Sequence, residues 1–275
     1  SRHFDSRVAS VPAVSGHGTH AWMTARVARF PGTVTRCSEY QVFVIDVGGL
    51  ELHIEQQSEK KRKGDEFSLY TIMWESAFIM IDYLTDEQRF PRGHFLGQRV
   101  LELGSGTGAV GLVLAALGAE VTMTDISEAL PLLQRNVAQN LAALPAPASS
   151  VCELDWARPA MPGAGAFDVV VGSDILFYEG LFQDLLNTLR AVMDTGTKCL
   201  LASVNRGYER VFFQMLEDDG FCLRHVTDFQ HDRFLRGCRA SVDVAADEVQ
   251  IVWASRAAGR PDLLSDAVPS SCATG

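Results

Sequence analysis

A glycine-rich segment in the first half of the chain has the composition of a turn that binds a cofactor. Residues 100–108 read VLELGSGTG, so an apolar run passes into three glycines separated by single small residues. Glycines let the backbone approach a ligand closely, and a helix after such a turn offers unpaired N–H groups. The residues that we expect to contact the ligand are Glu102, Gly104, Ser105, Gly106, Thr107 and Gly108.

Asp125 is a second candidate, because it ends the next apolar run after the turn. In parallel sheets that bind adenosine-containing cofactors, an acid at this place binds the ribose hydroxyls. The alternative is that Asp125 caps the N-terminus of the following helix. Its position at the end of a strand favours the ribose role, so the two features together indicate an adenosine-containing cofactor.

The charge around the turn distinguishes two kinds of cofactor. The pattern also fits dinucleotide-binding turns, because Ala109 can replace a last glycine and Asp125 lies 21 residues after the first one. No Lys or Arg lies between Val100 and Gln134, which would leave a pyrophosphate with repulsion from nearby acids. These acids are Glu102, Glu120, Asp125 and Glu128. S-adenosylmethionine carries a sulfonium and an ammonium, so the acids favour it over NAD(P), the cofactor of an alternative oxidoreductase function.

Asp155 and Trp156 follow the third expected strand, where the adenine of such a cofactor would rest. An indole can cover one face of an adenine, and the carboxylate of Asp155 can accept a hydrogen bond from the adenine amino group. The alternative is that Trp156 only packs. We predict that both residues contribute to cofactor binding.

Apolar runs alternate with segments of helical periodicity from residue 99 onward, which predicts an α/β fold. The expected strands are 99–103, 120–124, 150–154, 167–172, 198–203, 221–227 and 248–254, and the expected helices are 109–117, 128–141, 181–193 and 210–218. The last two strands lack a helix between them and should pair antiparallel. We therefore expect a Rossmann-like, mostly parallel seven-stranded sheet with an antiparallel last strand and helices on both faces, binding its ligand at the carboxyl ends of the strands.

The segments outside this pattern suggest four regions. Residues 1–38 are acid-poor and predict a flexible extension, and residues 39–66 predict a β-hairpin around Gly48 and Gly49 with a basic loop at Lys60–Lys63. Residues 67–256 form the expected main domain, beginning with a helix over 69–84. Residues 257–275 predict a disordered tail.

Residues 70–256 resemble the seven-strand S-adenosylmethionine-dependent methyltransferases, and more narrowly methyltransferase family 16, whose members are largely protein lysine methyltransferases. The resemblance is carried by TIMWESA at 71–77, by VTMTDISEAL at 121–130 with Asn136 and Asn140, and by SDILFYE at 173–179. It implies that Trp74 borders the methionine part of the cofactor, that Ser173 contacts the cofactor, and that S-adenosylhomocysteine is the product.

The same resemblance places the substrate side of the site after the fourth strand. Asp174 would orient the target nitrogen and Phe177 would form a wall of the lysine channel, where an aromatic face can hold an ammonium group. The family motif most often has Tyr at the position of Phe177, and Tyr178 is the candidate for supplying the missing hydroxyl. Because Phe177 lacks the hydroxyl of the usual Tyr, an alternative is that the protein binds S-adenosylmethionine without catalysing a reaction. Asn205 and Arg206, after the fifth strand, are either substrate contacts or turn residues.

Composition and charge exclude several classes of binding partner. A net charge of −10 argues against a protein that grips nucleic acid through a basic surface. No apolar run is long enough to span a bilayer, and the six cysteines form no CxxC pair. His17 and His20 lack a third ligand, so we expect no metal site. We expect a cytoplasmic monomer that acts on a protein, with mitochondrial targeting by the acid-poor start as the alternative.

Overall fold

The computed structural model describes residues 28–36, 40–57, 68–145, 149–159, 167–229 and 249–256. Most of the expected extension, the basic run Lys60–Lys63, the pair His17 and His20, and the expected tail lie outside these residues. Within the described ranges, none of the helices combines the length and apolar character needed to cross a membrane.

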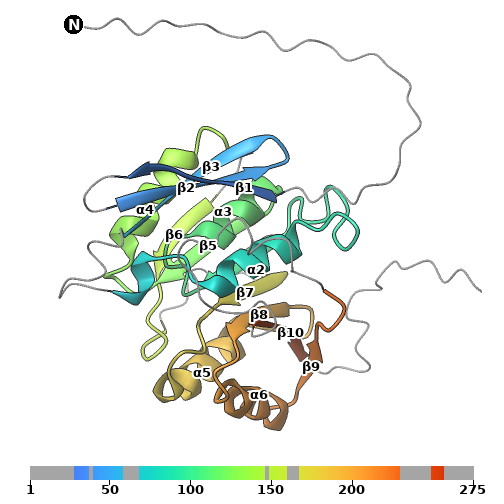
Figure 1. Ribbon diagram of the computed structural model, residues 1–275. Helices are drawn as coiled ribbons and strands as arrows, with labels where there is room; N and C mark the ends of the chain where they lie inside the picture. Colours follow the sequence, from blue (N-terminus) through green and yellow to red (C-terminus); the bar gives the residue numbers. More distant parts are fainter. Residues whose placement is uncertain are drawn as a thin grey trace, which may run out of the picture.

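A seven-stranded sheet forms the centre of the molecule (Figure 1). Its strands are β4 (Arg99–Leu103), β5 (Glu120–Asp125), β6 (Ser149–Glu153), β7 (Val169–Ser173), β8 (Lys198–Val204), β9 (Phe221–His225) and β10 (Val249–Arg256). The order across the sheet is β6-β5-β4-β7-β8-β10-β9. The neighbours from β6 to β8 pair in parallel, whereas β10 pairs antiparallel with both β8 and β9. The predicted fold class and the antiparallel pairing of the last two strands are confirmed.

Helices cover both faces of this sheet because its buried strands are apolar on both sides. In β7, Val169 and Val171 belong to one hydrophobic core and Val170 to the other. The first core lies under α2 (Glu75–Leu84), α3 (Ala109–Ala116) and α4 (Leu130–Asn140). The second lies under α5 (Phe182–Val192) and α6 (Glu209–Asp218). Figure 1 shows the two groups of helices on opposite sides of the strands.

A separate three-stranded antiparallel sheet packs on the α3 and α4 side and is called the N-terminal sheet below (Figure 1). It consists of β1 (Ala28–Arg36), β2 (Tyr40–Val47) and β3 (Leu50–Gln57), in that order. β2 and β3 form the hairpin that the sequence predicts around Gly48 and Gly49. β1 was not predicted: it lies inside the stretch 1–38 that we expected to be an extension. Its pairing with β2 is interrupted on either side of Gly32, which hides its strand pattern.

The structure also changes the expected helix over residues 69–84. Leu69–Thr71 form a short 3-10 helix, η1, and α2 begins only at Glu75. Between them the backbone of Ile72 and Trp74 is extended. The apolar residues in this stretch have helical spacing, but the N–H of Met73 bonds to a side chain of the N-terminal sheet instead of to a helical carbonyl.

Candidate active site

A cavity of about 630 Å³ lies at the carboxyl ends of β4, β5, β6 and β7. Its walls come from the glycine turn after β4 (residues 104–108), from the ends of β5 and β7, and from the loops after β6 and β8. Residues 68–74, called the wall segment below, supply six further lining residues: Ser68, Leu69, Tyr70, Ile72, Met73 and Trp74. The cavity occupies the place where the sequence predicts a ligand site.

The glycine turn is shaped so closely around its neighbours that side chains would not fit. Gly104 and Gly108 have φ values of 61° and 78°, a conformation that L-residues rarely adopt. A Cβ on Gly104 would stand 2.7 Å from Ile175, and one on Gly108 would stand 2.5 Å from Leu133. Ser105 fastens the turn to β5, because its N–H and Oγ bond to the backbone of Thr124 at 2.9 and 3.0 Å.

Asp125 joins the end of β5 to the glycine turn. Its Oδ2 accepts the N–H of Gly106 at 2.7 Å, and its Oδ1 accepts the N–H of Ile126 at 2.8 Å. Helix α4 begins five residues later with Ala129 as its N-cap, so Asp125 does not cap it. Burial raises the pKa of Asp125, and the two N–H groups oppose this shift. The carboxylate lines the cavity and keeps further acceptor positions for ribose hydroxyls.

Glu102 contributes a second acid to the cavity wall. Its side chain is buried, and within the described ranges its Oε2 has no hydrogen-bond partner. Burial raises the pKa of Glu102 to about 8, and the nearby charge of Asp125 adds to the rise against the lowering effect of Ser105 and the Gly111 N–H. A buried carboxyl with a raised pKa ionises more readily beside a positive charge, so Glu102 favours a cationic ligand.

The charges that line the cavity therefore fit S-adenosylmethionine. Four acids and one base are among the lining residues, and ion pairs occupy two of the acids: Asp155 with Arg158, and Asp174 with Arg206. No ion pair in the described part of the chain involves Glu102 or Asp125, so these two acids remain to face a sulfonium and an ammonium. When bound, the cofactor supplies a methyl group activated by the sulfonium.

The two residues expected to contact adenine, Asp155 and Trp156, lie next to the glycine turn. The ring of Trp156 approaches within 3.5 Å of the place where a Cβ on Gly104 would stand, and it lines the cavity together with Asp155. Asp155 accepts hydrogen bonds from Arg158 at 3.0 Å and from the N–H of Ala157 at 3.0 Å. These bonds, with that from Arg158 dominant, lower the pKa of Asp155. The structure brings both residues to the cavity, and their contact with adenine stays a prediction.

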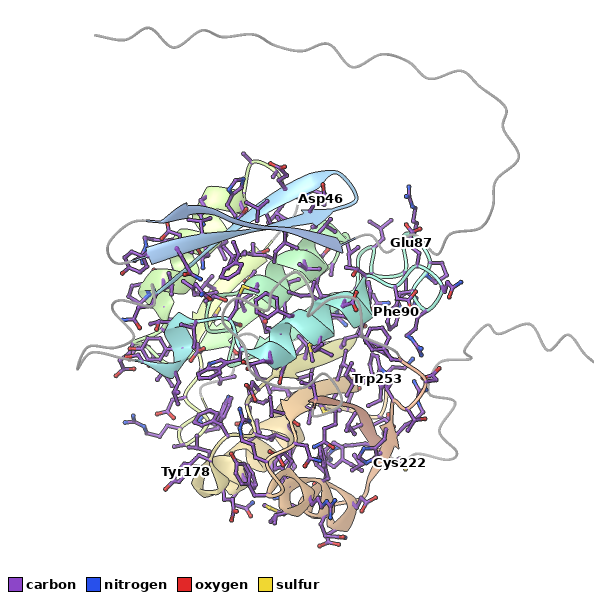
Figure 2. The ribbon with its side chains drawn as sticks, in the orientation of Figure 1. Asp46, Glu87, Phe90, Tyr178, Cys222 and Trp253 are labelled. Carbon is purple, nitrogen blue, oxygen red and sulfur yellow. The ribbon has the colours of Figure 1, made fainter. Side chains whose placement is uncertain are left out.

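The substrate side of the cavity contains Ser173, Asp174 and Phe177 but not Tyr178. Asp174 is buried and has a φ of 55°, while Phe177 is 39% exposed. Tyr178 is 62% exposed and its ring covers Gly180, where an added Cβ would stand 2.5 Å from the ring. Figure 2 shows Tyr178 at the outer surface of the molecule. A hydroxyl supplied by Tyr178 is therefore not available to the cavity in this arrangement.

Three residues from the loop after β8 and the start of α6 support this wall, and only Arg206 among them was considered from the sequence. Arg206 bonds to both carboxylate oxygens of Asp174, while Tyr208 donates its hydroxyl to the carbonyl oxygen of Phe177 at 3.0 Å. The buried Glu209 accepts the N–H groups of Arg206 and Gly207 at 2.9 and 2.8 Å. An acid placed five residues after the end of a strand, at the start of a helix, is the signal that could have identified Glu209 as a support for the loop after β8.

Strand order, glycine turn and acidic cavity together define an S-adenosylmethionine-dependent methyltransferase with the seven-strand fold. A family model described as lysine methyltransferase matches residues 51–219, more than half of the chain. The chain belongs to this family. The oxidoreductase alternative is thereby set aside.

Curated relatives agree with this family assignment, and a solved structure shares the fold. The chain is 37% identical over 155 residues to mouse protein N-lysine methyltransferase METTL21A, covering 55% of this chain and 69% of the relative. It is 35% identical over 156 residues to mouse EEF1A lysine methyltransferase 3, covering 56% of this chain and 65% of the relative. The match thus spans about two thirds of each relative. The T. thermophilus 16S rRNA N2 G1207 methyltransferase RsmC, solved with AdoMet and guanosine, shares the fold with a TM-score of 0.54 and 20% identity, over 80% of this chain and 52% of that one.

Proposed function

We propose that this protein transfers a methyl group from S-adenosylmethionine to the side-chain nitrogen of a lysine in a protein substrate. The observation that carries the proposal is the half-open aromatic wall at Phe177, beside the buried carboxylate of Asp174, in the same cavity as the glycine turn. An aromatic face next to an acid suits a long cationic side chain that enters from solvent. The family description and the names of both mouse relatives also support lysine as the target.

Within this proposal, the cofactor is held on the acidic side of the cavity. Asp125 takes the ribose hydroxyls, Trp156 covers the adenine, and Glu102 offsets the positive charge of the methionine part. The backbone of the glycine turn and the side chain of Trp74 complete the enclosure. Glu102, Asp125, Trp156, Trp74 and residues 104–107 of the glycine turn line one cavity, which supports their assignment to a single ligand. Gly108, which the sequence also predicts as a contact, is not among the lining residues.

Asp174 orients the lysine amine instead of removing its proton. Both of its carboxylate oxygens accept a hydrogen bond from Arg206, and each oxygen retains a second acceptor position for an amine N–H. A free lysine has a pKa of about 10.4, and a partly desolvated channel lowers it because burial disfavours the charged form. The proton therefore leaves to solvent before the neutral amine reaches the methyl group.

The proposal also includes a cytoplasmic location and a single-chain active unit. Cys152, Cys199 and Cys222 are free thiols, as is usual in a reducing compartment. Imaging of the tagged full-length protein and light scattering of the purified chain test these two points. A mitochondrial signal or a stable oligomer would contradict them.

Radiolabelled S-adenosylmethionine tests the chemistry. The wild-type chain and an Asp125→Ala variant are incubated with cell extract, and the labelled proteins are hydrolysed to amino acids. We expect labelled methyl-lysine with the wild type and little with the variant. EEF1A, named in the second relative, is the first purified substrate to try. Label in methyl-histidine or methyl-arginine would contradict lysine specificity, and no protein label would favour a binding module.

A further inference from the structure

Two glutamines at the end of the N-terminal sheet reach the wall of the cofactor cavity. Gln56 and Gln57 are the last residues of β3, and each is only 3% exposed. Oε1 of Gln56 accepts the backbone N–H of Met73 at 2.9 Å, and Oε1 of Gln57 lies 2.9 Å from the hydroxyl oxygen of Thr71. Both contacts therefore join β3 to the wall segment, residues 68–74.

The wall segment has little regular structure to hold it in place. It contains a single 3-10 turn followed by extended backbone at Ile72, and short 3-10 helices have poor hydrogen-bond geometry. Its remaining bonds include one from Trp74 Nε1 to the carbonyl oxygen of Leu69 at 2.9 Å. The carbonyl oxygen of Tyr70 lies 3.3 Å from the place where a Cβ on Gly106 would stand. A displacement of this segment would therefore change the space around the glycine turn directly.

Two asparagines of α4 fix the other side of β3. β3 is an edge strand of the N-terminal sheet, and edge strands carry backbone groups without a strand partner. Asn136 bonds to both the N–H and the carbonyl oxygen of Glu55 at 2.9 Å, and its Nδ2 also donates to the carbonyl oxygen of Thr107 at 2.8 Å. Asn140 bonds in the same way to both backbone groups of His53 at 2.8 Å. Side-chain amides thus pair the edge of β3, and Asn136 joins it to the glycine turn.

We propose that the N-terminal sheet is a structural part of the cofactor site, with Gln56 as the residue that positions the wall segment for S-adenosylmethionine binding. Asn136 and Asn140 hold β3 on α4 and Asn136 joins it to the glycine turn. Gln56 and Gln57, at the end of β3, hold the wall segment of the same cavity. The family match begins at residue 51, so it includes most of β3 but neither β1 nor β2. The strand that carries the glutamines is therefore the part of this sheet that the family match includes.

Titration of the purified full chain with S-adenosylhomocysteine tests this proposal. Gln56→Met keeps the length of the side chain but leaves the buried N–H of Met73 without an acceptor. We expect the dissociation constant to rise about tenfold. The KM for S-adenosylmethionine should rise in parallel, while the KM for the protein substrate stays unchanged. Gln56→Glu retains an acceptor oxygen at the same place and should recover part of the affinity.

Thr197→Val is the matched control, because it removes a buried hydrogen bond to the carbonyl oxygen of Phe167 and Thr197 does not line the cavity. It should lower the melting temperature while the dissociation constant stays within about twofold of the wild type. Unchanged affinity in Gln56→Met would overturn the proposal. Equal losses of affinity in the two variants would overturn it as well, because general destabilisation would then explain both. The titration contains no protein substrate, so failure to methylate lysine would refute the proposed function alone.

Discussion

The guanidinium of Arg206 donates two hydrogen bonds to the carboxylate of Asp174, from Nη1 to Oδ1 at 2.7 Å and from Nη2 to Oδ2 at 3.2 Å. Asp174 is buried at the end of β7 and has a φ of 55°, the one positive φ outside glycine among the described residues. Such a backbone conformation costs free energy, and the surrounding contacts must maintain it. The ion pair thus fixes both the charge and the direction of an acid on the substrate side of the cavity.

Replacing Arg206 should impair transfer more than cofactor binding. Arg206→Ala leaves a buried carboxylate unpaired and releases the loop that carries Phe177. We expect kcat/KM for the protein substrate to fall at least about tenfold, with the S-adenosylhomocysteine dissociation constant nearly unchanged. Steady-state kinetics and calorimetry measure the two effects. Arg210→Ala, an exposed arginine on α6, is the control, and equal activity in all three proteins would remove the pair from the account.

Phe177 should act through its aromatic face and not through a hydroxyl. Phe177→Ala removes a contact worth about 0.5 to 2 kcal/mol to an ammonium group, so kcat/KM should fall about twofold to thirtyfold. Phe177→Tyr keeps the ring and should retain most of the activity. Tyr178→Ala should behave like the wild type, because that ring lies outside the cavity wall. Loss of activity in Tyr178→Ala alone would show that the hydroxyl expected from the sequence reaches the substrate after all.

The buried carboxyl of Glu102 should make the ligand-free protein less stable as the pH rises. Its pKa is about 8 in the folded chain, above the ordinary value of 4.5. Because the folded state binds this proton more tightly, its stabilising effect is complete below pH 4.5 and is lost as the pH rises to 8. Glu102→Gln should therefore raise the melting temperature more at pH 8 than at pH 5. An equal effect at both pH values would contradict the raised pKa.

The same carboxyl should strengthen cofactor binding once it is ionised. A cation bound beside Glu102 favours its charged form, so part of the binding affinity should appear as the pH rises from 6 to 8. Glu102→Gln should bind S-adenosylhomocysteine more weakly, with a shallower pH dependence over this range. Calorimetric titrations of both proteins at several pH values measure the difference. Parallel pH profiles would mean that the cofactor's own groups account for the whole dependence.

Local patterns explain why much of the fold was predictable. Strand β4 and the glycine turn have the same bounds in the structure as in the prediction, because an apolar run followed by spaced glycines is a signal within a few residues. The hairpin of β2 and β3 was equally local. β1 was missed because Pro31 and Gly32 interrupt its strand pattern, and its assignment depends on pairing with β2.

Most of the predicted site residues that line the cavity lie at or just after a strand end, and Trp74, which precedes α2, was predicted from the family resemblance. Asp125, Trp156 and Asp174 met in one cavity because parallel strands end at the same edge of the sheet. The contacts of Arg206 with Asp174, and of Gln56 with Met73, join residues from different elements. In the sequence, Arg206 and Gln56 are polar positions that belong to no repeating pattern. Their roles therefore become visible only in the folded structure.

The most direct test of the account uses S-adenosylmethionine with an isotopically labelled methyl group and purified EEF1A, followed by tandem mass spectrometry of the protein. We expect the wild-type chain to place the labelled methyl group on a lysine side chain, and Asp125→Ala to do so much more slowly. Should EEF1A remain unmodified, the labelled proteins from the extract take its place in the same measurement. Labelled methyl groups found only on residues other than lysine, or found equally with Asp125→Ala, would contradict it.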